Sequence, residues 1–374
     1  MRLSNLAKVF YPETGFTKGQ MIDYYVRIAP LLLPHLKQRP LTLKRYPNGV
    51  TGMYFYEKNC PGHRPEWVQT ASVWSSGNNR WMKYCLVQDL ATLVWCANLA
   101  DIELHTSLSL AGDSSRPTVI VFDLDPGEPA GVVQCCQAAL WVRALFDRLG
   151  LESFPNTSGS KGLQVYIPLN VPITYAETKA FTHEFAQTLE RQHPDLIVSD
   201  MKKAVRHGRV FVDWSQNDDH KTTVCVYSLR AKARPTVSTP LQWKEVEHCL
   251  KKAQPELLVF DSGQVLSRGE KLGDLFAPVL ELRQKLPTIE ELRSASTAHD
   301  NAKPGAGKSA KPGGAARVET SPRDGSKKSV AAGKRPSAVS EQLTHAGPGA
   351  PAARRTSKRS KAAKSSPDPS SRRA

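Results

Sequence analysis

Apolar residues recur with helical spacing in four stretches of the chain. Thr17 and Gln20 have the spacing of a capping box and open the first predicted helix, which continues to Ala29. Pro30 and Pro34 are expected to interrupt or end this helix, because proline lacks the N–H that a helix interior needs. The other predicted helices are 90–99 with Asp89 as its cap, 132–149 with Gly150 at its end, and 175–192, which follows a second capping box at Thr174.

Shorter apolar runs, bounded by glycine, proline or polar residues, predict strands. They cover 41–46, followed by a Pro-Asn-Gly turn, then 163–169 and 209–214. Helices interleave irregularly with these strands, hairpin-like pairs occur, and no strict β-α-β alternation runs through the chain. The pattern therefore predicts an α+β fold.

The run from Thr118 to Gly127 carries the most informative chemistry. Its apolar residues lie on both faces of a strand, which indicates an interior strand of a covered sheet. Asp123 and Asp125 point to the same face, because side chains alternate along a strand. Two carboxylates at the end of a buried strand repel each other unless a cation lies between them, and oxygen ligands suit Mg²⁺ or Mn²⁺. The pair is a candidate metal site; the alternative is two solvated aspartates in a turn.

Two further segments could complete a site around this pair. Residues 157–162 read Thr-Ser-Gly-Ser-Lys-Gly, a loop whose backbone N–H groups, hydroxyls and lysine could hold phosphate, although its spacing is not that of a Walker A loop. The alternative is an ordinary turn. Asp213 ends an apolar strand and could supply a third carboxylate; the alternative is a strand-end aspartate that caps a turn. Asp218 and Asp219, in the polar loop that follows, are expected to be solvated.

The composition changes at about residue 293. Residues 1–293 have the composition of a folded domain, whereas residues 294–374 contain no aromatic residue and carry 17 Lys and Arg against 5 Asp and Glu. This segment holds +12 of the chain's net charge of +16. Such a composition cannot bury enough apolar surface to fold, so we expect a disordered tail that contacts nucleic acid through its charge. The alternative is a solubilising linker.

Cysteine usage and hydropathy narrow the class of protein. The 7 cysteines are scattered, with no CxxC pair, which indicates buried reduced thiols rather than a disulfide framework or a zinc site. No apolar stretch approaches the length of a membrane span, and the N-terminus does not resemble a signal peptide. A cytoplasmic protein is therefore expected.

Lysines and aromatic residues gather near the N-terminus, where they could contact phosphates and stack on unpaired bases. For any one of them, a core aromatic residue or a surface lysine is the alternative. Together with the segments above, they form an ordered series of motifs at 8–12, 15–18, 54–58, 121–128, 157–162, 212–217 and 227–231. This series resembles the polymerase domain of bacterial DNA ligase D, a member of the archaeo-eukaryotic primase superfamily. The resemblance covers roughly residues 2–292.

The resemblance implies a primase-polymerase fold with mixed and antiparallel sheets, flanking helices and an RRM-like catalytic core. It also implies roles for individual residues. The carboxylates that hold two Mn²⁺ or Mg²⁺ ions would be Asp123, Asp125 and Asp213, with His105 nearby in the active site. The triphosphate of an incoming NTP or dNTP would be held by Ser158, Lys161 and Arg230. The downstream 5′-phosphate of the DNA would be held by Lys8 and Lys18, and the template would pack on Phe55 and Tyr56.

One position departs from the family pattern. Relatives often carry histidine at the position of Gln164, where it faces the triphosphate. Glutamine can donate a hydrogen bond but carries no charge, so triphosphate binding is expected to be weaker. Gln164 is nevertheless a candidate nucleotide-binding residue.

The implied function is template-dependent nucleotide addition at gaps and DNA ends during non-homologous end joining. The implied partners are 5′-phosphorylated DNA, Ku and a separate ATP-dependent ligase, in the bacterial cytoplasm at the nucleoid. The sequence shows no Lys-x-Asp-Gly motif for ligase adenylation, so a stand-alone polymerase module without ligase activity is expected. Two alternatives stay open: a non-catalytic scaffold that binds DNA ends, and a phosphatase of the haloacid-dehalogenase type, although Pro126 replaces the threonine usual in its motif.

Overall fold

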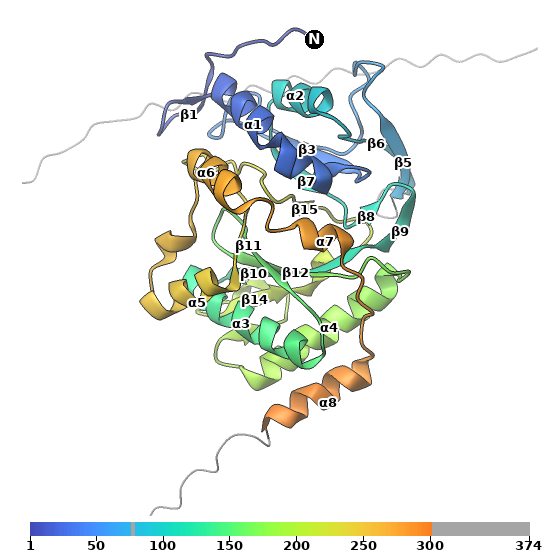
Figure 1. The fold of residues 1–374 in the computed structure, drawn as a ribbon, viewed down its shortest axis with the longest axis vertical. Helices are drawn as coiled ribbons and strands as arrows, with labels where there is room; N and C mark the ends of the chain where they lie inside the picture. Colours follow the sequence, from blue (N-terminus) through green and yellow to red (C-terminus); the bar gives the residue numbers. More distant parts are fainter. Residues whose placement is uncertain (76–78, 301–374) are drawn as a thin grey trace, which may run out of the picture. The chain divides into compact units, whose positions relative to one another are not determined.

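The computed structural model describes residues 1–75 and 79–300, with side chains up to residue 297. These residues belong to one compact unit. The predicted α+β class is confirmed, since two six-stranded sheets are flanked by helices (Figure 1). Within the described ranges, no helix is long and apolar enough to cross a bilayer.

The central sheet is built around β10 (Val119–Pro126). Its order is β13 (Ile197–Val198), β14 (Val210–Asp213), β10, β12 (Leu163–Pro168), β11 (Phe154–Thr157) and β16 (Thr239–Pro240). Neighbouring strands are antiparallel except for the parallel pair β13 and β14. Its core lies against α3 (Val132–Arg148) and α4 (Tyr175–Gln192), where Phe122, Phe146 and Phe185 pack with ring centroids 4.4–5.9 Å apart.

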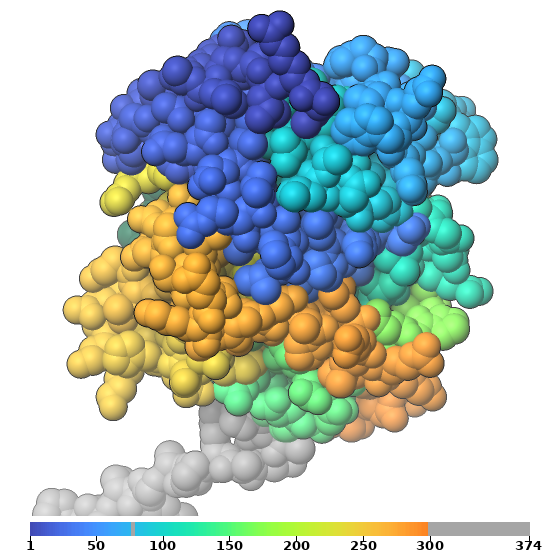
Figure 2. All heavy atoms as spheres, turned by 45° about the horizontal axis from the view of Figure 1, so that its top comes forward, coloured from blue at the N-terminus to red at the C-terminus, as the bar shows by residue number. Residues whose placement is uncertain are grey.

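The N-terminal sheet has the order β15 (Thr223–Val224), β7 (Asp101–Thr106), β3 (Leu41–Arg45), β6 (Arg80–Cys85) and β5 (Thr70–Ser75), with β4 (Phe55–Glu57) paired to β3. It packs with α1 (Lys18–Leu36) and α2 (Leu90–Asn98) into a second core. Helix α6 (Ser262–Leu272) lies against α1, as Figure 2 shows from one face.

Smaller elements complete the described fold. Two short hairpins are formed by β1 (Val9–Tyr11) with β2 (Phe16–Thr17) and by β8 (Ser109–Leu110) with β9 (Asp113–Pro117). The remaining helices are α5 (Trp243–Lys252), α7 (Ala277–Glu281) and α8 (Ile289–Asp300), and the 3₁₀ turns are η2 (Lys203–Val205), η3 (Trp214–Gln216) and η4 (Pro255–Leu258).

Helices α1, α2 and α4 begin where the capping residues in the sequence predict. Thr17 and Thr174 form the expected capping boxes, and Asp89 caps α2 through the backbone N–H of Thr92. The expectation for Pro30 and Pro34 was wrong, because α1 continues through both to Leu36. Both prolines lie on its exposed side, so water can satisfy the carbonyls that lose their partners.

A second correction concerns two cysteines. Cys60 and Cys85 form a disulfide, although reduced thiols were expected throughout. The backbone N–H of Cys60 donates to the carbonyl of Lys83, which places Cys60 beside the end of β6. A separation of 25 residues without a motif gave no signal of this proximity. The other five cysteines are free and buried, as expected.

The predicted domain boundary at residue 293 falls inside α8. Leu292 is fully buried in the core of the central sheet, and the Gln192 side chain donates to the carbonyl of Ser296 at 3.0 Å. The Arg293 guanidinium also lies 3.2 Å from the Glu184 carboxylate. Residues 294–300 therefore belong to the folded unit, and the rest of the predicted tail lies outside the described residues.

We predict that a chain ending at Asp300 keeps the stability of the full-length chain, whereas a chain ending at Arg293 loses about 1–2 kcal/mol. The shorter chain lacks the last turns of α8 and the contact of Ser296 with Gln192. Urea unfolding of the three chains measures this difference. Equal midpoints for all three would show that residues 294–300 contribute nothing to the fold.

Candidate active site

Strand β10 presents two different faces to the protein. Ile120, Phe122 and Leu124 on one face are buried in the core beneath α3 and α4. On the other face, Val119 and Val121 join the N-terminal core, and Asp123 and Asp125 follow them into a cavity. The predicted alternation is therefore confirmed, and both carboxylates lie on one face as expected. Asp123 is half-buried, and Asp125 is open to the cavity.

The strand register brings the other predicted residues to Asp123. Asp213 on β14 lies opposite Asp123 on one side, and Gln164 on β12 lies opposite it on the other. Asp213 is buried, and its carboxylate accepts from the backbone and hydroxyl of Ser215 and from the side chain of Gln216 at 2.5–2.9 Å. The three carboxylates thus come from two neighbouring strands.

A cavity of about 490 Å³ opens between the two sheets. Asp123, Asp125 and Gln164 line it from the central sheet, and His105 lines it from β7. Four basic residues also line it: Lys161, Lys203, Arg206 and Arg230. One cavity therefore combines a carboxylate pair with several cationic groups.

The carboxylates repel one another in this setting. Burial, followed by the charges of Asp125 and Asp213, raises the pKa of Asp123 well above its ordinary value. Burial and the charge of Asp213 also raise the pKa of Asp125, while Arg206 and Arg230 act in the opposite direction. An oxygen-only donor set with mutual repulsion fits a hard divalent cation such as Mg²⁺ or Mn²⁺.

The loop at 157–162 turns sharply beside β10. The Ser158 hydroxyl donates to the carbonyl of Gly162 at 2.9 Å, and the Arg230 guanidinium donates to the carbonyl of Ser158. Gly159 adopts φ +64°, and a Cβ at Gly162 would lie 2.1 Å from a backbone oxygen of Leu124, so these two positions require glycine. Lys161 is exposed and forms an ion pair with Glu128 at 2.9 Å.

Gln164 is fixed by its neighbours. Its Oε1 accepts from the Tyr166 hydroxyl at 3.0 Å and from the Asn156 amide at 3.2 Å. A hydrogen bond from Gln164 is also among the influences that act against the raised pKa of Asp123. Gln164 therefore lies beside Asp123 in addition to lining the cavity.

His105 lies in the cavity wall, and its partner is a residue that the sequence reasoning missed. Its Nε2 lies 3.0 Å from Oε2 of Glu103, a buried carboxylate two positions earlier on β7. Burial lowers the pKa of His105, although Glu103 acts in the opposite direction. The Glu-x-His spacing on a strand could have revealed the pair, because it places both side chains on one face.

Lys8 and Lys18 are brought together by the first hairpin. The backbone N–H of Lys18 donates to the carbonyl of Lys8, and burial and the charge of Lys8 lower the pKa of Lys18. The ammonium of Lys18 contacts Asn98, and that of Lys8 contacts Asn48, at 2.9 and 2.8 Å. Because the charge of Lys8 acts on Lys18, an anion that contacts both side chains would be favoured.

Phe55 and Tyr56 lie on β4, and both rings are about half exposed. The guanidinium of Arg45 lies over the Phe55 ring at 5.1 Å, and the ammonium of Lys44 lies over the Tyr56 ring at 5.5 Å. The Tyr56 ring also meets the His105 ring, with centroids 5.9 Å apart. The aromatic pair is therefore continuous with the cavity wall.

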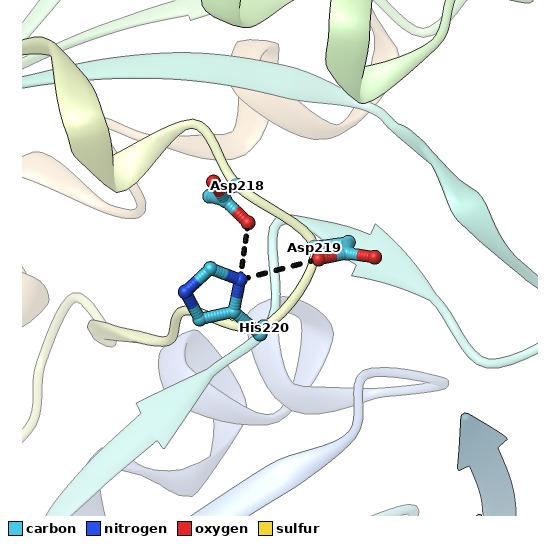
Figure 3. Close-up of side chains that lie close together, drawn as sticks. All are labelled: Asp218, Asp219 and His220. Carbon is cyan, nitrogen blue, oxygen red and sulfur yellow. Dashed lines mark hydrogen bonds and ion pairs between the residues drawn. The ribbon is translucent and has the colours of Figure 1, made fainter. Parts of the chain in front are cut away.

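The loop after β14 corrects another expectation. Asp218 is buried rather than solvated, and it forms an ion pair with Lys179. It also forms an ion pair with His220 (Figure 3). Within the described ranges, one cluster of three or more His, Cys, Asp or Glu side chains has all its possible metal-binding atoms within 4.8 Å of one another. It consists of Asp218, Asp219 and His220. The Lys179 ammonium already neutralises Asp218, so these contacts account for the cluster as an ion-pair network. Asp123, Asp125 and Asp213 are spread more widely, in keeping with their repulsion.

The comparisons with known proteins identify the family. Residues 17–276 match the family model described as LigD, primase-polymerase domain. The multifunctional non-homologous end joining protein LigD of Mycolicibacterium smegmatis is 41% identical over 301 residues, which are 79% of this chain and 38% of the relative. The bifunctional protein LigD of Bacillus subtilis is 34% identical over 274 residues, which are 73% of this chain and 43% of the relative. The chain belongs to the LigD primase-polymerase family.

A solved structure gives the same result for the fold. It is the polymerase domain from Mycobacterium tuberculosis ligase D in complex with DNA, with a TM-score of 0.70 and 37% identity over 76% of this chain and 99% of that chain. The predicted primase-polymerase fold is thereby confirmed. The chain spans about two fifths of the length of the curated relatives it matches.

We predict that Asp123→Asn stabilises the metal-free protein by up to about 1 kcal/mol and removes stabilisation by Mn²⁺. The substitution relieves repulsion by Asp125 and Asp213 and takes away an ionic ligand. Thermal unfolding in EDTA and in Mn²⁺ measures both effects, with the exposed Asp200→Asn as the control. A variant that Mn²⁺ stabilises as much as it does the wild-type chain would exclude Asp123 as a ligand.

Proposed function

We propose that the chain is a metal-dependent, template-directed nucleotidyltransferase that fills gaps and extends DNA ends in non-homologous end joining. The observation that carries the proposal is the cavity in which Asp123 and Asp125 face basic residues. A divalent cation and a polyphosphate need opposite charges within one site, and this cavity offers both. Family membership adds support, because the relatives are named for end joining.

The carboxylates that would hold divalent cations are Asp123, Asp125 and Asp213, with the backbone and side-chain donors around Asp213 fixing its orientation. Bound Mg²⁺ or Mn²⁺ would lower the pKa of the attacking 3′-hydroxyl and neutralise charge on the leaving pyrophosphate. The protein's own contribution is to place both reactants, since phosphoryl-type transfer depends on alignment and charge stabilisation.

The triphosphate side of the site would be formed by the 157–162 loop and Arg230. The Arg230 guanidinium is anchored on the Ser158 carbonyl, which keeps its charge at the loop. Lys161 would exchange its exposed contact with Glu128 for a phosphate, because a surface ion pair contributes little stability. Gln164 lies between this loop and Asp123, so it would serve both the nucleotide and the metal ligands.

The DNA side would extend from the cavity across the N-terminal sheet. Tyr56 adjoins His105 at the cavity wall and offers an exposed ring with Phe55 for the template. Lys8 and Lys18, whose charges influence each other, would bind the downstream 5′-phosphate through their ammonium groups. DNA with a 5′-phosphorylated gap or break is therefore the proposed substrate, and Ku and a DNA ligase are the proposed partners.

We predict that Asp123→Ala and Asp125→Ala each lower nucleotide addition at least tenfold while DNA affinity stays within about twofold, because two-metal transfer needs both carboxylates. The assay uses a gapped, 5′-phosphorylated duplex with NTP or dNTP and with Mn²⁺ or Mg²⁺, and Asp200→Ala is the matched control. Full activity in either variant would overturn the proposed site. DNA binding without nucleotide addition by the wild-type chain would support the scaffold alternative.

We also predict that removal of residues 301–374 weakens DNA binding and flattens its salt dependence without altering the rate of addition on saturating DNA. These residues lie outside the described structure, but they carry 17 basic and 4 acidic side chains. Each phosphate that they neutralise adds about 0.9 to the slope of log affinity against log salt. An unchanged slope in fluorescence anisotropy titrations would contradict the proposed tether.

A further inference from the structure

Glu103 gathers donors from three parts of the fold around one buried carboxylate. Its Oε2 lies 3.0 Å from the Lys44 ammonium, 3.0 Å from Nε2 of His105 and 3.5 Å from Nε of Arg230. Its Oε1 accepts from the backbone N–H of Ala231 at 3.0 Å. The Glu103 side chain is only 1% exposed.

The strand register explains how these groups meet. Lys44 on β3 pairs with Glu103 on β7 and with Tyr56 on β4, so the three residues form a row across the sheet. His105 lies two positions beyond Glu103 on the same face and meets the Tyr56 ring. The row therefore connects the exposed aromatic surface to the cavity wall.

Glu103 itself does not line the cavity, whereas His105 and Arg230 do. Arg230 extends the connection further, because its guanidinium also donates to the Ser158 carbonyl in the 157–162 loop. Any influence of Glu103 on a ligand must therefore pass through the residues it holds.

The charge of Glu103 is maintained by its partners. Burial alone would raise the pKa of this carboxyl, but the hydrogen bond with His105 and the charges of Arg230 and Lys44 hold it below its ordinary range. The carboxylate is thus ionised at neutral pH. Without it, the positive charges of Lys44 and Arg230 would have no counter-charge at this point, and they would repel each other.

We propose that Glu103 is a positioning residue for the incoming nucleotide, holding Arg230 and His105 in the cavity wall and Lys44 beneath the template-facing aromatic surface. This assignment rests on the proposed nucleotidyltransferase function. It differs from a purely stabilising role in one respect: loss of Glu103 misplaces the nucleotide contacts even when the fold persists.

Glu103→Gln tests the assignment, because it keeps the size of the side chain. A glutamine has one oxygen, so its NH₂ group must face either the Ala231 N–H or the cluster of Lys44, His105 and Arg230. In either orientation, the NH₂ group of the glutamine faces another hydrogen-bond donor. We expect KM for the nucleotide to rise about tenfold or more, the effect of losing one charge-assisted hydrogen bond, while the affinity for gapped DNA stays within about threefold.

The matched control is Glu245→Gln. Glu245 on α5 accepts from the guanidinium of Arg268 on α6 at 2.7 and 2.9 Å, and the substitution removes this carboxylate. Glu245 is absent from the cavity lining, so this variant should lose stability without a change in KM. Binding of Mn²⁺–ATP without DNA, measured by calorimetry, gives a second reading: the Glu103 variant should bind at least tenfold more weakly than the wild-type chain.

If Glu103→Gln does not fold, Glu103→Asp keeps the charge but places it one methylene farther from its partners, and an increase of KM by threefold or more is expected. An unchanged KM in a folded Glu103 variant, with or without a lower Tm, would overturn the positioning role. Failure of the wild-type chain to add any nucleotide would overturn the proposed function instead, and the calorimetric comparison would still decide the role of Glu103.

Discussion

Repulsion between like charges is the constraint on which the active site depends. Asp123, Asp125 and Asp213 extend from adjacent strands whose other faces are packed in an apolar core. The sheet fixes the backbone of these residues, so the strand register limits how far the carboxylates can move apart. Partial removal of water strengthens their repulsion and raises the pKa of Asp123 and Asp125. The fold thus holds a concentrated negative charge that a divalent cation can relieve.

The positive charges in the cavity come from side chains outside the strands of the central sheet. Arg230 and Lys161 reach the cavity from loops, and Lys203 and Arg206 come from η2 and the residue after it. Loops can change their lining residues without disturbing the buried strands, whereas the carboxylates are tied to the register. This division places the proposed metal ligands on a rigid support and the groups that would contact phosphates on segments that can adjust.

Sequence reasoning was most successful where local chemistry determines local structure. Capping residues located the starts of α1, α2 and α4, and the alternation of β10 placed Asp123 and Asp125 on one face. The helical continuation through Pro30 and Pro34 was missed, because exposure of those positions depends on tertiary packing. The disulfide of Cys60 with Cys85 was missed for a similar reason, since the pairing depends on which loop lies beside β6.

The site was predicted less completely than the strands that carry it. Alternation along the strand identified Asp123 and Asp125, and the apolar strand before Asp213 suggested a third carboxylate. The register of β14 and β12 explains why Asp213 and Gln164 adjoin Asp123. Glu103 was missed because its importance arises from partners at 44, 105 and 230, which no local pattern connects. The burial of Asp218 was missed because it requires Lys179 from a distant helix. In both cases the decisive contact is an ion pair between remote segments.

The most direct test of the account is whether the template base selects the nucleotide that is added. Four gapped, 5′-phosphorylated duplexes that differ only in the template base would each be incubated with the four NTPs separately in Mn²⁺. The account predicts that the complementary nucleotide is incorporated most efficiently on every template. Addition that ignores the template base, or no addition on any of the four duplexes, would contradict it.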